Sequence, residues 1–179
     1  MTPILNKANE RITAIERRWI PGMASHEQAI GATDEWYTPP WIFDALGVRF
    51  DMDVASPGRD VVPWIPASIH ITERSLETLW SGPVWLNPPF GARNGVVPWL
   101  MRIAEHGDGM ALVPNRTGAD WWQDFAQRAD GLLFIRGKVK FLRPDGSEGE
   151  SPGYGNVLMA FGRKMAGALK SSRIGGFRA

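Results

Sequence analysis

The sequence contains no cysteine and only three histidines among its 179 residues. The absence of cysteine excludes disulfide bonds, iron–sulfur clusters and a thiol nucleophile. The histidines, His26, His70 and His106, do not have the spacing of metal ligands, so we predict no bound metal. Each of them is expected to be an ordinary polar or capping residue rather than a catalytic one.

The sequence also has no run of about 20 apolar residues, and its charges nearly cancel to a formal +1. The opening residues, Met1 to Lys7, lack the charged-then-apolar order of a signal peptide. With 44% hydrophobic residues, the composition is that of one globular domain with a proper core. We therefore expect a cytoplasmic protein without a membrane partner.

Residues 1–35 have the pattern of a helical appendage. An apolar stripe with alternating steps of three and four residues ends at Pro21-Gly22 and consists of Leu5, Ala8, Ile12, Ile15 and Trp19. We expect the stripe to pack on the body of the same chain, with self-association into a homodimer as the alternative use.

The next elements have clearer boundaries. Thr38 is a good N-cap residue, Pro39 suits the first position of a helix, and Gly47 ends it. Alternating apolar residues then predict a strand over 48–54. The pattern from 59 to 82 is weak, with a short strand at 69–72 and a helical turn at 75–80 as the best assignments.

Short apolar runs alternate with helical patterns over the rest of the chain. Strands are expected at 84–86, 110–113 and 132–135, and helices at 96–105 and 119–129. This alternation predicts an α/β fold with a doubly wound, mainly parallel sheet over residues 36–162. Residues 138–142 and 157–161 flank a loop rich in proline and glycine, and we expect them to form a C-terminal antiparallel hairpin.

Residues 163–179 carry basic residues and no acidic residue, which predicts a basic C-terminal tail. A tail of this charge can contact nucleic-acid phosphates, through Arg163, Lys164, Lys170 and Arg173. A solvated, frayed terminus is the alternative explanation.

The segment Asn87-Pro88-Pro89-Phe90 follows a predicted strand, where ligands bind in a doubly wound sheet. Both prolines lack an N–H, so the turn is stiff and presents carbonyl groups as acceptors. The Asn87 side chain and the Pro88 carbonyl can both accept from one planar NH₂ group, while Phe90 offers a face for the attached ring. Such a turn suits an amino group on a flat heterocycle.

An aromatic amine is a poor nucleophile because its lone pair is delocalised into the ring. Acceptors that hold both its hydrogens return electron density to the nitrogen, more strongly in the transition state than in the ground state. A sulfonium cofactor with a transferable methyl group fits as the electrophile, since direct displacement depends on positioning and polarisation.

Three segments together resemble the phage-type DNA N6-adenine methyltransferase family (Dam-like). They are Trp36-Tyr37-Thr38-Pro39-Pro40, Phe50-Asp51-Met52-Asp53-Val54-Ala55-Ser56 and Trp85-Leu86-Asn87-Pro88-Pro89-Phe90. The resemblance implies a class I, Rossmann-like fold that binds S-adenosylmethionine, and a bacterial host cell as the location if a phage or prophage encodes the chain. It also implies DNA as the partner, with an adenine flipped onto a catalytic motif formed by Asn87, Pro88, Pro89 and Phe90.

The same resemblance implies a cofactor site formed by Tyr37, Thr38, Pro39, Asp53, Ala55 and Asn87. No Gly-x-Gly follows the first strand here, so Asp53 becomes the more important contact and could accept from the methionine ammonium. The resemblance does not assign the acid that binds the ribose hydroxyls, and Glu73 is one candidate. Other planar amines, cytosine N4 or a protein glutamine amide, and a catalytically silent DNA-binding protein of the same fold remain as alternatives.

Overall fold

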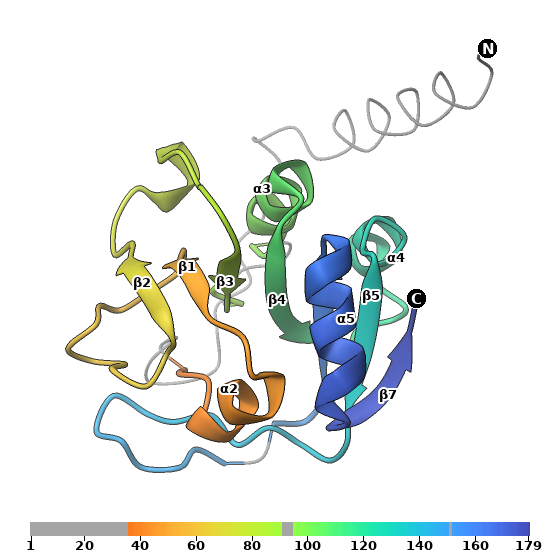
Figure 1. Ribbon diagram of the computed structural model, residues 1–179. Helices are drawn as coiled ribbons and strands as arrows, with labels where there is room; N and C mark the ends of the chain where they lie inside the picture. Colours follow the sequence, from red (N-terminus) through yellow and green to blue (C-terminus); the bar gives the residue numbers. More distant parts are fainter. Residues whose placement is uncertain (1–35, 91–94, 151) are drawn as a thin grey trace.

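A seven-stranded sheet in the order β2-β1-β3-β4-β6-β5-β7 forms the centre of the molecule (Figure 1). The computed structural model describes residues 36–90, 95–150 and 152–179. The strands are β1 (Phe50–Asp53), β2 (Ala67–His70), β3 (Val84–Leu86), β4 (Gly109–Pro114), β5 (Gly131–Ile135), β6 (Asn156–Phe161) and β7 (Gly175–Arg178). The helices are α2 (Pro40–Leu46), α3 (Val97–His106), α4 (Asp120–Ala126) and α5 (Arg163–Ser172), with a 3₁₀ turn η1 (Ser75–Glu77).

The first half of the sheet is parallel and the second half is antiparallel. Strand β1 pairs in parallel with β2 and β3, and β3 with β4. Strand β6 runs antiparallel to both β4 and β5, so β4 and β5 point the same way with a reversed strand between them. Strand β7 closes the edge antiparallel to β5. The predicted α/β class with a mainly parallel, Rossmann-like sheet is confirmed.

Helices cover both faces of the sheet (Figure 1). The side chains of α2 and α5 pack in one apolar cluster and those of α3 and α4 in a second. Successive residues of β4 alternate between these clusters, with Met110 and Leu112 in the first and Ala111 and Val113 in the second. Because both faces are covered, all six residues of β4 are buried, which explains the continuous apolar runs in the sequence.

A β-bulge in β1 sets the direction of its last side chains. Asp51 and Met52 both donate their backbone N–H to the Pro83 carbonyl, at 2.7 and 3.4 Å. The extra residue places Phe50 in the first cluster but Met52 in the second. The following side chain, that of Asp53, therefore points to the face that α2 covers.

Helix α2 begins one residue later than predicted. Thr38 is not the N-cap; Pro39 takes that position in an extended conformation, and Pro40 is the first helical residue. A proline disfavours helical angles at the residue before it, so the pair Pro39-Pro40 moves the helix start. The predicted end is confirmed, since Gly47 adopts the left-handed conformation with φ 60°.

The antiparallel strands are present, but the predicted pairing of 138–142 with 157–161 is wrong. Strand β6 pairs instead with β4 and β5, while Leu142 forms only isolated bridges to Tyr37 and Glu148. Every residue of β6 is buried, as a central strand requires. The segment 138–142 alternates exposed lysines with buried Val139 and Phe141, which suits a covering segment instead.

The weak region 59–82 contains β2 two residues before the expected strand, and its helical turn is the short η1. Residues 163–179 form α5 and β7 instead of a free tail. The predicted helical appendage and its homodimer stripe lie in residues 1–35, outside the described residues. No helix in the described part of the chain is long and apolar enough to cross a membrane.

Because α5 completes the first cluster, we predict that Leu169→Ala lowers the free energy of unfolding by about 2–5 kcal/mol. Leu169 is fully buried between α5 and the sheet, whereas its neighbour Lys170 is exposed. Denaturant unfolding followed by circular dichroism measures the change. Lys170→Ala is the matched control and should remain within about 0.5 kcal/mol of the unsubstituted protein. Equal stability of both variants would show that α5 does not belong to the core.

Candidate active site

A cavity of about 470 Å³ opens at the carboxyl ends of the parallel strands. The chain leaves β1 toward β2 on one side and leaves β3 toward β4 on the other, so the strand order reverses between β1 and β3. Ligands of doubly wound sheets bind at such a reversal. The walls come from the ends of β1 and β3, the segment after β2, one residue of α3, and the residues before α2, through Trp36, Tyr37, Val54, Ala55, Ser56, Pro57, Ile71, Thr72, Glu73, Arg74, Ser75, Leu76, Glu77, Asn87, Pro88, Pro89, Phe90 and Trp99.

Six of the nine residues predicted for the catalytic and cofactor sites line this cavity. They are Tyr37, Ala55, Asn87, Pro88, Pro89 and Phe90. The other three do not line it. Thr38 and Pro39 are buried at the start of α2, where the Thr38 carbonyl accepts from the Trp64 indole at 2.9 Å. Asp53 is buried behind the wall that Ala55 and Ser56 form.

The Asn87 side chain has a fixed orientation at the end of β3. Its Nδ2 donates to the Trp36 carbonyl at 2.8 Å, which leaves Oδ1 buried and without a partner among the described residues. The next two residues, Pro88 and Pro89, have no N–H that could compete as a donor. A buried acceptor without a donor is costly, so this oxygen is prepared for a donor from a ligand.

The residues that precede α2 are held against the loop after β5. Tyr37 and Leu142 exchange two backbone hydrogen bonds of 2.9 Å each. The Trp36 ring packs on Gly149, where a Cβ atom would come within 2.4 Å of the ring. The position of Trp36, and hence of the Asn87 amide, therefore depends on a segment more than 100 residues away in the sequence.

A second cavity of about 370 Å³ shares Trp36 and Phe90 with the first. Its remaining walls come from the loop between β5 and β6, through Phe141, Arg143, Glu150, Pro152, Gly153 and Tyr154. Phe141 and Tyr154 add two aromatic rings to those of Trp36 and Phe90. Arg116 lies over the Tyr154 ring at 5.2 Å, and Arg143 lies 6.0 Å from the Trp36 ring. The two cavities thus meet at Trp36 and Phe90.

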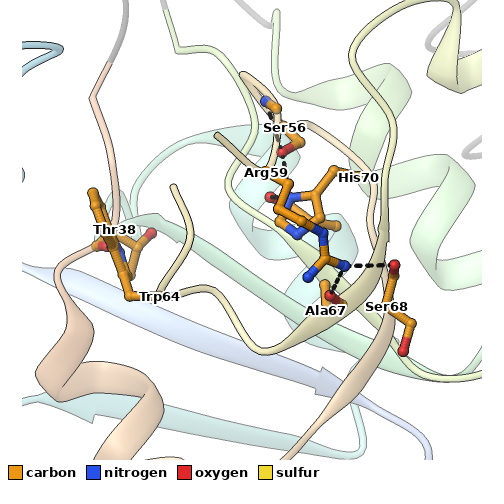
Figure 2. A network of polar contacts seen from close by, with 9 residues as sticks. Thr38, Ser56, Arg59, Trp64, Ala67, Ser68 and His70 are labelled. Carbon is orange, nitrogen blue, oxygen red and sulfur yellow. Dashed lines mark hydrogen bonds and ion pairs between the residues drawn. The ribbon is translucent and has the colours of Figure 1, made fainter. Parts of the chain in front are cut away.

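Behind the first cavity lies a buried polar cluster of Asp53, Ser56 and His70, of which Figure 2 shows Ser56 and His70. The Ser56 hydroxyl lies 2.9 Å from His70 Nδ1, and the same nitrogen lies 3.5 Å from Asp53 Oδ2. Burial raises the pKa of Asp53 from 3.8 to about 6, against the opposing effect of hydrogen bonds from Ser56 and the Ala55 backbone. Burial, and next the positive charge of Arg59, lower the pKa of His70. At neutral pH the cluster therefore holds a carboxylate and a neutral imidazole.

Several wall residues were not predicted from the sequence. Trp99 belongs to the apolar face of α3, and Tyr154 lies in a loop without periodicity, so neither carries a local pattern. Glu73 and Glu77 both reach the first cavity. Glu77 is paired with Arg74, with an Nε to Oε2 distance of 2.9 Å.

The four predicted nucleic-acid contacts lie near opposite ends of the strands, two on the side of the cavities and two on the other side. Helix α5 begins after β6, whose last residue pairs with the first residue of β4. Arg163 and Lys164 therefore lie near the amino-terminal end of β4, on the side of the sheet away from the cavities. Helix α5 ends before β7, whose first residue pairs with Ile135 at the end of β5. Lys170 and Arg173 are consequently nearer to the carboxyl ends of the parallel strands, where the cavities lie.

The walls of the first cavity fit S-adenosylmethionine. The volume lies in the range of small-ligand sites, and the aromatic rings of Trp36, Tyr37 and Phe90 suit a sulfonium cation. The carboxylate of Glu73 provides an acceptor for ribose hydroxyls. Within the described residues, no group of three or more His, Asp or Glu could hold a metal ion.

The buried carboxylate makes stability depend on pH. Because the pKa of Asp53 is higher in the folded chain than in the unfolded chain, its contribution to stability is greatest at low pH and is lost as the pH rises through 6. We predict that Asp53→Asn gains stability relative to the unsubstituted protein by about 1.5 kcal/mol between pH 5 and pH 8. Urea unfolding of both proteins at the two pH values tests this, and a difference independent of pH would contradict it.

Comparison with protein families agrees with this geometry. The family model described as DNA N-6-adenine-methyltransferase (Dam) matches residues 26–172. No curated protein and no solved structure matches the chain. The matched region contains both cavities and every strand except β7. The chain therefore belongs to the DNA N-6-adenine-methyltransferase (Dam) family.

Proposed function

We propose that this chain transfers a methyl group from S-adenosylmethionine to the exocyclic N6 amine of an adenine in DNA. Membership of the Dam family supports DNA adenine methylation in general. The observation that carries the finer proposal is the Oδ1 of Asn87 in the first cavity, which is buried without a partner among the described residues. It lies on the same turn as Phe90, which lines both cavities. One cavity would hold the cofactor and the other the adenine.

The second cavity supports a flat base as the substrate. Phe90 and Trp36 stand on the wall shared with the first cavity, and Tyr154 and Phe141 stand around the remaining space. Aromatic rings stack on any base, and a flipped base needs such contacts to offset a few kcal/mol of lost stacking and pairing. Arg116 and Arg143 flank these rings and would contact the phosphates beside the flipped nucleotide.

Asn87 would act on the amine through hydrogen bonds alone. Its Oδ1 and the Pro88 carbonyl accept the two N–H groups, which draws the nitrogen toward a tetrahedral geometry and raises its nucleophilicity. S-adenosylmethionine supplies the methyl group on a sulfonium sulfur, which keeps the electron pair of the broken C–S bond as the new N–C bond forms. The proton displaced from the amine then passes to water.

The cofactor would lie across the ends of β1 and β2. Ala55 and Ser56 form the wall beside β1, and Tyr37 closes the methionine end. Glu73 stands three residues after β2 and 20 residues after Asp53, a spacing typical of the acid that binds ribose hydroxyls in doubly wound folds. Asp53 would act through Ser56 and the Ala55 backbone instead of touching the cofactor.

We predict that Asn87→Ala lowers kcat for methyl transfer by about 100- to 1,000-fold, because the lost acceptor acts chiefly in the transition state. The dissociation constant for S-adenosylmethionine should change by less than about threefold. Transfer of a labelled methyl group to DNA, protein and RNA in parallel measures the activity, and mass spectrometry of digested DNA identifies the base.

Asn87→Asp is the matched variant, since it keeps an acceptor oxygen and loses the donor to Trp36. It should retain at least about tenfold more activity than Asn87→Ala. Label on cytosine or on protein would support the other planar amines, whereas DNA binding without any label would support the silent DNA-binding protein.

The assignment of Glu73 gives a separate prediction. Glu73→Gln should raise the dissociation constant for S-adenosylmethionine by about tenfold, because hydrogen bonds to a charged acceptor are the stronger ones. Glu77→Gln is the control, since its carboxylate is already paired with Arg74. Isothermal titration calorimetry compares the two variants. A larger effect of Glu77→Gln would exchange the roles of the two residues.

A further inference from the structure

The turn that follows β1, residues 54–58, forms one wall of the cofactor cavity without the usual glycine-rich sequence. Its single glycine, Gly58, lies at the end with φ +114°. The backbone of the turn is joined to both neighbouring strands. Val54 donates to the Trp85 carbonyl at 3.0 Å, and Ser56 donates to the Ile71 carbonyl at 3.1 Å. The side chain of Ser56 adds further contacts to this backbone hydrogen bond.

The Ser56 hydroxyl is the centre of these side-chain contacts. It accepts from the backbone N–H of Gly58 at 3.2 Å, which closes the turn. His70 Nδ1 lies 2.9 Å away (Figure 2), and a hydrogen bond from the Ser56 hydroxyl reaches Asp53. If Nδ1 carries the proton, His70 donates to Ser56 and Ser56 donates to Asp53, whose Oδ2 remains without a hydrogen bond among the described residues.

The other nitrogen of the ring supports this tautomer. His70 Nε2 is buried and has no partner among the described residues. A buried acceptor without a partner is tolerated more often than a buried N–H without one. The Asp53 carboxylate, 3.5 Å from Nδ1, also favours a proton on that nitrogen.

The three residues have the composition of a nucleophilic triad but not its geometry. In such a triad, the imidazole contacts serine through one nitrogen and the carboxylate through the other. Here Nδ1 faces both Ser56 and Asp53, while Nε2 faces neither. The ring therefore cannot relay a proton from serine to aspartate, and the cluster has a positioning role.

Arg59 holds the far side of the same turn. Its Nη2 donates to the carbonyls of Ala67 and Ser68, at 2.9 and 2.7 Å (Figure 2). These carbonyls belong to β2, which is the edge strand of the sheet. The guanidinium thus ties the segment after the turn to the strand that carries His70.

We propose that His70 is a positioning residue for cofactor binding, which holds Ser56 and thereby the β1 turn in the conformation that receives S-adenosylmethionine. This inference depends on the proposed function because the proposed function supplies the identity of the ligand, S-adenosylmethionine. His70 acts from behind the wall, because its side chain is 4% exposed and does not line the cavity.

The test is the affinity for S-adenosylmethionine and for S-adenosylhomocysteine, measured by isothermal titration calorimetry on the full chain at pH 7.5. His70→Phe keeps the buried ring and removes the donor, and it should raise the dissociation constant by about tenfold or more. His70→Asn places an amide donor near the position of Nδ1 and should restore affinity to within about threefold of the unsubstituted protein. His70→Gln is the matched control, since its amide reaches toward the position of Nε2 and should not restore binding.

A double-mutant cycle distinguishes the loss of the contact between His70 and Ser56 from a general loss of stability. In the Ser56→Ala background, His70→Phe should have no further effect on the dissociation constant, because the contact is already absent. Additive effects of the two substitutions, or equal affinity of His70→Phe and the unsubstituted protein, would overturn the positioning role. If the unsubstituted protein binds neither ligand, the cofactor assignment itself fails, which is a different result from binding that is insensitive to His70.

Discussion

The hydrogen bond from the Asn87 amide to the Trp36 carbonyl determines what the end of β3 can do. Without it, the amide could turn and present either its oxygen or its NH₂ group to the cavity. With Nδ2 held at 2.8 Å from Trp36, only Oδ1 is left for a ligand. Two prolines then remove the neighbouring backbone donors. The turn is therefore selective for a donor ligand, and an NH₂ group on a flat ring meets this requirement better than a carbonyl or a hydroxyl does.

The turn after β1, which forms another wall of the first cavity, has a different structural requirement. A glycine-rich turn reaches a ligand closely because it has no side chains, whereas the turn after β1 has Ala55, Ser56 and Pro57 at this place. Small side chains and a proline keep the wall thin and stiff, and the hydroxyl of Ser56 ties it to Asp53 and His70. The cost is a buried carboxylate whose pKa rises to about 6.

The sequence predicted the strands of the sheet better than their partners. The apolar runs at 84–86, 110–113 and 132–135 correspond to β3, β4 and β5, since burial on both faces leaves a continuous pattern. The pairing of 157–161 could not be predicted, because an antiparallel strand inserted between two parallel ones involves contacts far apart in the sequence. The basic residues after 162 drew attention away from α5, whose buried residues Met165, Ala166 and Leu169 occupy one face of the helix.

The part of the site that lies in one short segment could be predicted from the sequence, whereas the parts that several segments form together could not. Asn87-Pro88-Pro89-Phe90 could be assigned because two prolines after a strand have a clear physical consequence. Asp53 was expected to touch the cofactor, but the bulge at Asp51 and Met52 turns its side chain to the face that α2 covers. A bulge adds one residue to a strand, so it reverses every later side chain without a pattern that the sequence reveals.

The direction of β6 explains why a second cavity lies beside the first. Strand β5 ends on the side of the sheet where the first cavity opens, and the antiparallel β6 begins on that same side. The connection between β5 and β6 therefore stays near the carboxyl ends of the parallel strands. A parallel strand in place of β6 would have required the connection to cross to the other end of the sheet. Near the carboxyl ends, the connection supplies Phe141, Arg143 and Tyr154 to the second cavity, and Leu142 fixes the residues that orient Asn87. A single reversed strand thus provides both the walls of the second cavity and the support for the Asn87 amide.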